Sequence, residues 1–70
     1  MNLGECNEGK YILTKIPQGI YGDKLLFMGL ELGESINVVS VLDYVTIQHD
    51  KIMLSISKPI AEKIKVEKGE

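Results

Sequence analysis

The stretch Asp23-Lys-Leu-Leu-Phe-Met-Gly-Leu-Glu-Leu-Gly33 decides the fold, because it alone combines a helix start, a helix stop and a direct passage into a strand. The Asp23 carboxylate can accept hydrogen bonds from the unpaired amides of a first turn, which predicts this residue as the N-cap. Gly29 can adopt the left-handed conformation that ends a helix, and Leu30 can then fold back over the last turn. The stretch predicts a helix of about one turn near residues 23–29.

This short helix carries more apolar residues than it can bury. A one-turn helix is unstable alone in water, so it must pack against the rest of the domain. The four residues from Leu25 to Met28 are all apolar. Successive positions rotate by roughly 100° in a helix, so these four side chains cannot all face inward. Some apolar side chains are therefore expected at the surface.

The rest of the chain predicts short strands. Alternating apolar residues indicate strands over 10–16, 44–48 and 51–56, and the run rich in Ile and Val over 35–42 gives the longest strand signal. In that run the alternation shifts by one residue, which indicates either a bulge or a strand shared between two sheet layers. Ser57 followed by Lys and Pro predicts a helical turn near 58–63, before a last strand at Ile64 to Val66. The pattern predicts a mainly β fold, a small SH3-like barrel of about five short strands.

Length and composition exclude several classes of function. The 70 residues allow one domain, residues 1–70, with a small core. The net charge is −2, so the chain lacks the positive electrostatic field that attracts nucleic acid. All eight basic residues are Lys, so it also lacks the bidentate guanidinium groups that recognise phosphates and bases. No apolar run approaches the roughly 18 residues that would insert into a bilayer. Because Cys6 is the only cysteine and no signal sequence is recognisable, we expect a cytoplasmic protein.

Two residues are candidates for binding a transition metal such as iron or zinc. Thiolate, imidazole and carboxylate are ligands that ferrous and zinc ions accept, so Cys6 and His49 could bind a metal with nearby acidic side chains. The alternative is an incidental thiol and a solvated turn residue, because their spacing matches no metal motif. One His and one Cys also give no nucleophile and base arrangement at motif strength, so the sequence predicts no enzyme.

A docking surface is the other candidate site. Exposed aliphatic and Met side chains on a small domain indicate contact with a partner. The alternative is ordinary core packing of the same residues. The hypothesis covers the helix and the loop before it, namely Ile20, Tyr21, Leu25, Phe27, Met28 and Leu30.

The chain resembles the FeoA family of ferrous iron transport proteins almost from end to end. The most specific part of the resemblance is Lys24-Leu25-Leu26-x-Met28-Gly29-Leu30-x-x-Gly33-x-x-Ile36-x-Val38-Val39. A weaker part is Leu54-x-Ile56-x-Lys58-x-x-Ala61-x-x-Ile64-x-Val66. The chain departs from the family pattern at Leu32, where Pro is usual, at Lys58, where Arg is frequent, and in a shortened hairpin loop near Asp43.

The resemblance implies an SH3-like barrel without enzymatic activity. It implies binding to the cytoplasmic GTPase domain of the ferrous iron permease, and an association with transition metals. The first hypothesis is therefore an accessory protein that binds and modulates this permease. The alternative is a metal-sensing or self-associating module, able to form a homo-oligomer, that acts with a metal-dependent transcriptional repressor.

Overall fold

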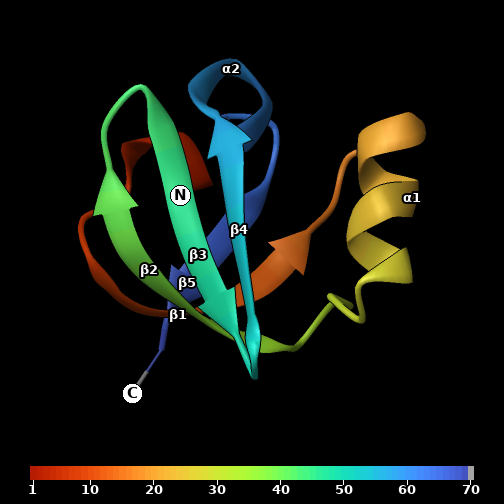
Figure 1. Ribbon diagram of the computed structural model, residues 1–70, viewed down its shortest axis with the longest axis horizontal. Coiled ribbons are helices and arrows are strands. Elements are labelled where there is room, and N and C mark those ends of the chain that lie inside the picture. Colours follow the sequence, from red (N-terminus) through yellow and green to blue (C-terminus); the bar gives the residue numbers. More distant parts are fainter. Residues whose placement is uncertain (70) are drawn as a thin grey trace.

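The computed structural model describes residues 1–69 and confirms the mainly β fold. In this part of the chain, five antiparallel strands form one strongly bent sheet in the order β4-β3-β2-β1-β5 (Figure 1). The strands are β1 Gly9–Lys15, β2 Ser35–Val41, β3 Tyr44–His49, β4 Ile52–Ser57 and β5 Lys65–Lys68. The helices are the 3-10 helix η1 Leu3–Glu5 and the α-helices α1 Ile20–Phe27 and α2 Lys58–Ala61.

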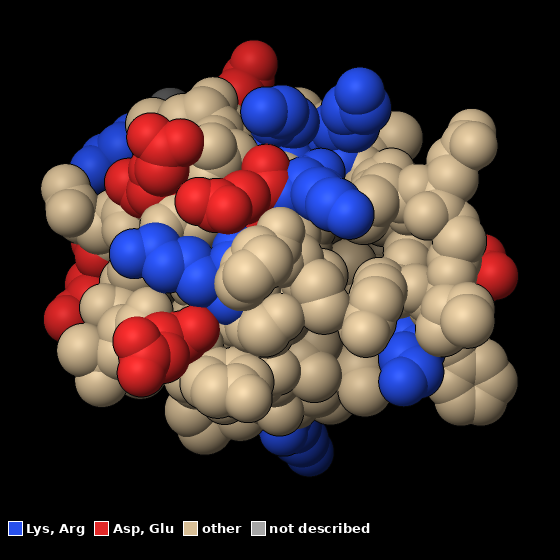
Figure 2. Space-filling model, turned by 90° about the horizontal axis from the view of Figure 1, so that it is seen from above, with Lys and Arg blue, Asp and Glu red and all other residues tan. Residues whose placement is uncertain are grey.

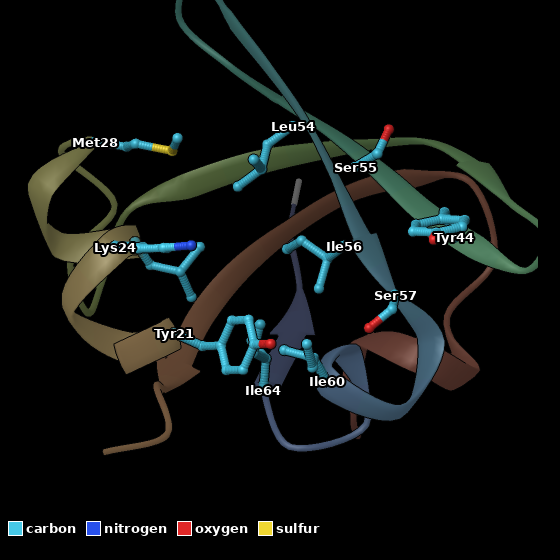
Figure 3. A pocket seen from close by; sticks show the side chains of 11 residues that line it. Tyr21, Lys24, Met28, Tyr44, Leu54, Ser55, Ile56, Ser57, Ile60 and Ile64 are labelled. Atoms are coloured by element: carbon cyan, nitrogen blue, oxygen red, sulfur yellow. The ribbon is translucent and has the colours of Figure 1, made fainter. Parts of the chain in front are cut away.

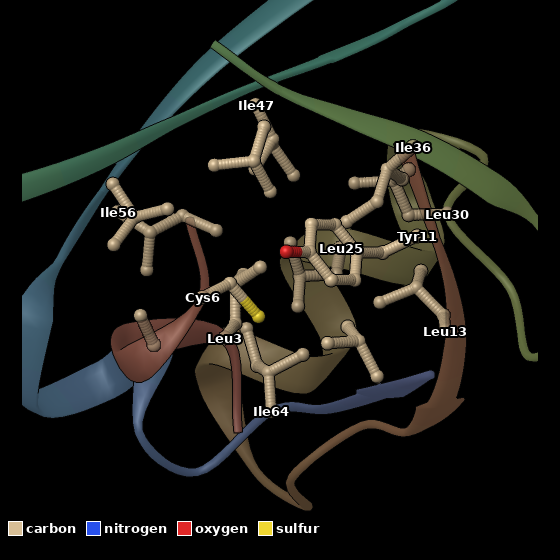
Figure 4. Close-up of a cluster of buried hydrophobic side chains, with 14 residues drawn as sticks. Leu3, Cys6, Tyr11, Leu13, Leu25, Leu30, Ile36, Ile47, Ile56 and Ile64 are labelled. Atoms are coloured by element: carbon tan, nitrogen blue, oxygen red, sulfur yellow. The ribbon is translucent and has the colours of Figure 1, made fainter. Parts of the chain in front are cut away.

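One hydrophobic core fills the inside of the bent sheet (Figure 4). Its members come from every element. Each strand turns alternate side chains inward, and the helices contribute Leu3, Leu25 and Ala61. Complete burial of one Leu, Ile or Val side chain contributes roughly 1.5–3 kcal/mol, so this cluster accounts for most of the stabilisation of so small a domain. The buried residues are Leu3, Cys6, Tyr11, Leu13, Leu25, Leu30, Ile36, Val38, Val45, Ile47, Ile56, Ala61, Ile64 and Val66.

The central hairpins lie where the alternation predicted them, with strand ends that differ by one residue. The register between β2 and β3 shifts between Val38 and Ser40, as the broken alternation predicted. The β3–β4 hairpin reverses at Asp50 and Lys51, and Asp50 takes a φ of 57°. Asp50 has a positive φ and Lys51 does not, which is the pattern of a type II′ turn, whose twist matches that of the strands it joins.

The start of α1 differs from the prediction. The helix begins at Ile20, and Asp23 lies inside it, donating its backbone N–H to the Gly19 carbonyl oxygen at an N···O distance of 2.9 Å. Asp23 is therefore not the N-cap. Gly19 takes that position with a φ of 103°, a conformation that glycine adopts easily. Ile20 and Tyr21, predicted as loop residues, form the first turn.

The end of α1 confirms the prediction. Gly29 has a φ of 86°. Its N–H bonds to the Leu26 carbonyl at 3.0 Å, and the Leu30 N–H bonds back to the Leu25 carbonyl at 2.9 Å. This pair of bonds is the Schellman motif, and it satisfies two carbonyls that would otherwise have no partner. The motif also turns Leu30 into the core, where it is buried.

The second helix is shorter than predicted. It ends at Ala61, and Ser57 occupies the N-cap position without a side-chain hydrogen bond to the helix. Pro59 lies in the first turn, where a missing N–H costs nothing. The chain turns directly after the helix, and Ala61 and Ile64 are both buried in the core. Within residues 1–69, no helix is long and apolar enough to cross a membrane.

Candidate docking site

The outer face of α1 presents apolar side chains to solvent. Phe27 is 94% exposed and Ile20 is 72% exposed. With Met28 they border one shallow hollow, which Asp23 and Lys24 also line. Ile20, Asp23, Lys24 and Phe27 follow the spacing of a single helix face. We call Ile20, Phe27 and Met28 the α1 patch.

The structure divides the residues predicted for docking. Leu25 and Leu30 are only 5% and 2% exposed, so these two belong to the core and cannot make a surface contact. Leu25 is the side chain that attaches α1 to the barrel. Leu26 was not predicted for docking, yet it is half exposed. Had Leu25 been assigned to the inward face, the helical rotation of roughly 100° per residue would have placed Leu26 outward.

A groove lies on the other side of α1, between this helix and β4. Figure 3 shows Tyr21, Lys24 and Met28 on the helix facing Leu54 and Ile56 of β4 across it. Its volume is about 280 Å³. We call it the α1–β4 groove. Its full lining is Tyr21, Lys24, Leu25, Met28, Tyr44, Leu54, Ser55, Ile56, Ser57, Ile60 and Ile64.

The groove follows the place where the sheet is not closed. Strands β4 and β5 stand at the two ends of the strand order, and in the described chain they do not pair with each other. Ile60 and Ile64, which come from the connection between these strands, line the groove. The sequence analysis did not find this site, because its lining comes from four separate segments that only the bend of the sheet brings together.

The groove is apolar and carries one cation. Lys24 is its only Lys, Arg, Asp or Glu side chain. The Lys24 Nζ atom lies 5.8 Å from the centre of the Tyr21 ring, within the range of a cation–π contact. Among residues 1–69, no carboxylate forms an ion pair with it. Acidic side chains gather on the left of Figure 2, and the surface on the right, where α1 lies, is mainly uncharged.

The described residues do not bring the two metal candidates together with a third potential ligand. Cys6 is 3% exposed, points into the core (Figure 4), and donates its thiol to the Asn2 carbonyl oxygen at 3.3 Å. Burial raises the pKa of the Cys6 thiol, which disfavours the thiolate that a metal needs, and the Tyr11 hydroxyl opposes this only in part. The His49 Nδ1 atom lies 3.1 Å from the Ser35 carbonyl oxygen. The described residues contain no group of three or more His, Cys, Asp or Glu able to bind a metal.

The burial of Cys6 predicts an unreactive thiol. We expect the folded protein to react with a disulfide reagent such as DTNB about 100-fold more slowly than the urea-unfolded chain, because access requires an opening that costs a few kcal/mol. Comparable rates in the two states would contradict the buried position.

The raised pKa of the Cys6 thiol predicts a pH dependence of stability. The neutral thiol's contribution to the free energy of unfolding should be fully present below the unfolded thiol's pKa of about 8.5 and should fall as the pH rises above it. Cys6→Ala should remove this decrease at high pH.

These observations define a class, namely small SH3-like barrels that present an apolar helix beside an open groove. The model of the FeoA domain family matches residues 1–68. The chain therefore belongs to the FeoA domain family. The comparison with curated proteins gives no match.

Solved structures agree with this assignment. One described as "Iron Uptake Regulatory Protein (FeoA)" is 28% identical with a TM-score of 0.79, and the match covers 96% of this chain and 95% of that one. ScaR with bound Cd²⁺ is 26% identical with a TM-score of 0.84, over 97% of this chain and 35% of its own. The manganese regulator SloR, at 19% identity, a TM-score of 0.82 and coverage of 97% and 34%, supports the fold alone. The chain thus spans about a third of the length of these two regulators.

Proposed function

We propose that this protein is a non-enzymatic cytoplasmic accessory protein of ferrous iron transport, which binds and modulates the GTPase-permease of the system. Membership of the FeoA domain family supports the link to iron uptake, because a solved relative carries that description. The observation that carries the docking role is the α1 patch, where three apolar side chains stand on one short helix at the surface. Contiguous exposed apolar surface on a small protein indicates a partner contact.

A test of the docking role needs a surface residue of α1 that can be substituted without unfolding the protein. Phe27 touches solvent over nearly its whole side chain, so its contribution to folding is small. An aromatic side chain of this kind becomes a strong anchor when a partner covers it. Stability and binding therefore depend on different residues of the same helix.

Phe27→Asp should weaken the capture of the purified GTPase domain of the permease at least about tenfold, because a charge would replace an apolar anchor. The measurement is a pull-down with the tagged protein, with and without guanine nucleotide. The control is Leu42→Asp, which places the same charge at another exposed apolar residue, between β2 and β3 and away from α1 (Figure 1). Equal capture by wild type and Phe27→Asp, or equal losses in both variants, would contradict the proposal.

A second candidate function follows from the likeness to the metal regulators. ScaR, solved with bound Cd²⁺ and with bound Zn²⁺, is 26% identical to this chain in both structures. This supports a metal-sensing or self-associating module that acts with a transcriptional repressor. The neighbouring reading frame separates the two functions: a GTPase-permease gene favours the first, and a helix-turn-helix regulator gene favours the second. Dimerisation through the α1 patch, measured by sedimentation, would also favour the second.

A further inference from the structure

We propose that the α1–β4 groove binds an extended apolar segment of a partner protein, which carries a carboxylate and pairs with the free edge of β4 as an added strand. The inference rests on the proposed docking function and adds the chemistry of the docked segment. Three observations carry it: the backbone of β4, the apolar lining and the unpaired Lys24.

The first observation is the direction of the β4 backbone groups. The register pairs Tyr44 with Ser57, and the Lys58 N–H donates to the Asp43 carbonyl oxygen at 3.1 Å in continuation of that register. Hydrogen-bonded and non-hydrogen-bonded pairs alternate along an antiparallel ladder. Counting from Lys58, the residues that bond to β3 are therefore Ile56, Leu54 and Ile52.

The backbone groups of Met53 and Ser55 consequently point away from β3, toward the open edge. In the described chain β4 pairs with β3 alone, so these N–H and C=O groups have no strand partner. Ser55 lines the groove, so its free backbone borders the space where a segment would lie. A row of free donors and acceptors is complementary to one kind of occupant, an extended peptide backbone.

The second observation is the apolar lining beside this edge. Leu54, Ile60 and Met28 are only partly covered and line the groove together. Alternate side chains of an added strand would point toward these residues. Apolar side chains at every second position would therefore be selected.

The third observation is charge. Lys24 is the only ionic side chain in the groove lining and has no acidic partner in the described part of the chain. An occupant with an Asp or Glu near its apolar positions would supply the missing charge, whereas a basic segment would be repelled. Electrostatic complementarity thus favours an acidic segment and disfavours a basic one.

The test uses two synthetic peptides, Ac-Asp-Ser-Val-Ser-Leu-Ser-Val-NH2 and Ac-Val-Ser-Leu-Ser-Val-Ser-Asp-NH2, which place the carboxylate at either end of the alternating pattern. We expect at least one of them, at millimolar concentration, to shift the amide NMR signals of Met53 and Ser55 and to slow their hydrogen exchange. The same peptide with Lys for Asp should bind about fivefold more weakly, the effect of one exposed ion pair. N-methylation of those alternate peptide amides that would face β4 should abolish the shifts.

Ser55→Pro provides the matched variant, because it removes an outward N–H that the β3–β4 ladder does not use. It should weaken peptide binding at least about tenfold, while Ser55→Ala, which also loses the 3.1 Å contact with the Thr46 hydroxyl, should bind as wild type. Thermal unfolding checks that both variants fold.

Three results would overturn the inference: no shift with either peptide, equal binding of the N-methylated peptide, or concentration-dependent shifts of the same amides without peptide, which would identify a second copy as the occupant. Because no permease is present, failure of the GTPase-domain pull-down leaves this result readable by itself.

Discussion

Leu25→Ala should lower the free energy of unfolding by about 2–5 kcal/mol, the usual cost of a cavity at a buried leucine. The same substitution at the next residue, Leu26→Ala, should change it by less than about 0.5 kcal/mol, because that side chain is half exposed. A domain of this length is stabilised by roughly 4–10 kcal/mol in total, so the first change removes a large share.

Urea unfolding followed by circular dichroism measures both variants under identical conditions. The pair is matched in residue type, substitution and helix, so the difference reports burial alone. Similar losses in the two variants would mean that α1 is not attached to the barrel through Leu25.

Gly22→Ala should be comparably severe, with a loss of about 3 kcal/mol or more, at the upper end of overpacking effects. A Cβ atom at this position would lie 1.8 Å from the Pro17 carbonyl oxygen. That oxygen belongs to the backbone, so the loop or the first turn of α1 must move to accommodate the methyl group. In an open helix the same change would be stabilising, because Ala is the better helix former.

The control for Gly22→Ala is Gln18→Ala, an exposed change in the same loop that should stay within about 0.5 kcal/mol. Urea unfolding of both variants tests the contact directly. A Gly22→Ala protein as stable as wild type would contradict the close approach of α1 to Pro17. Because the contact fixes how α1 leaves the barrel, the variant should also lose affinity for a partner that docks on the α1 patch.

Local chemistry allowed the end of α1 and the hairpins to be predicted. Gly29 and Leu30 carry the signal for a helix end within two residues, and the shift of alternation after Val38 marks the bulge. The start of α1 was predicted incorrectly, because Asp23 is a good N-cap by residue type. The tight packing of Gly22 on Pro17, which depends on tertiary structure, accompanies an N-cap four residues earlier, at Gly19.

The candidate site was predictable only in part. Counting apolar residues on a short helix shows that some must be exposed, but it does not show which. The choice follows from Leu25 being the inward residue, and this depends on where the barrel lies relative to α1. The groove could not be predicted, since Lys24, Tyr44 and Leu54 are far apart in sequence. The metal hypothesis for Cys6 and His49 rested on residue types. The Cys6 thiol is buried, and the described residues contain no group of three or more His, Cys, Asp or Glu around either residue.

The central claim is that α1 is attached to the barrel by its inner face and uses its outer face and the adjoining groove to bind a partner. The most direct test is to map the amide NMR signals of the labelled protein during titration with the purified GTPase domain of the permease. Our account predicts that the affected signals lie in Ile20–Phe27, at Met28 and along Met53 to Ser55. Binding that perturbs the β2–β3 turn around Leu42 and leaves α1 unchanged would contradict it.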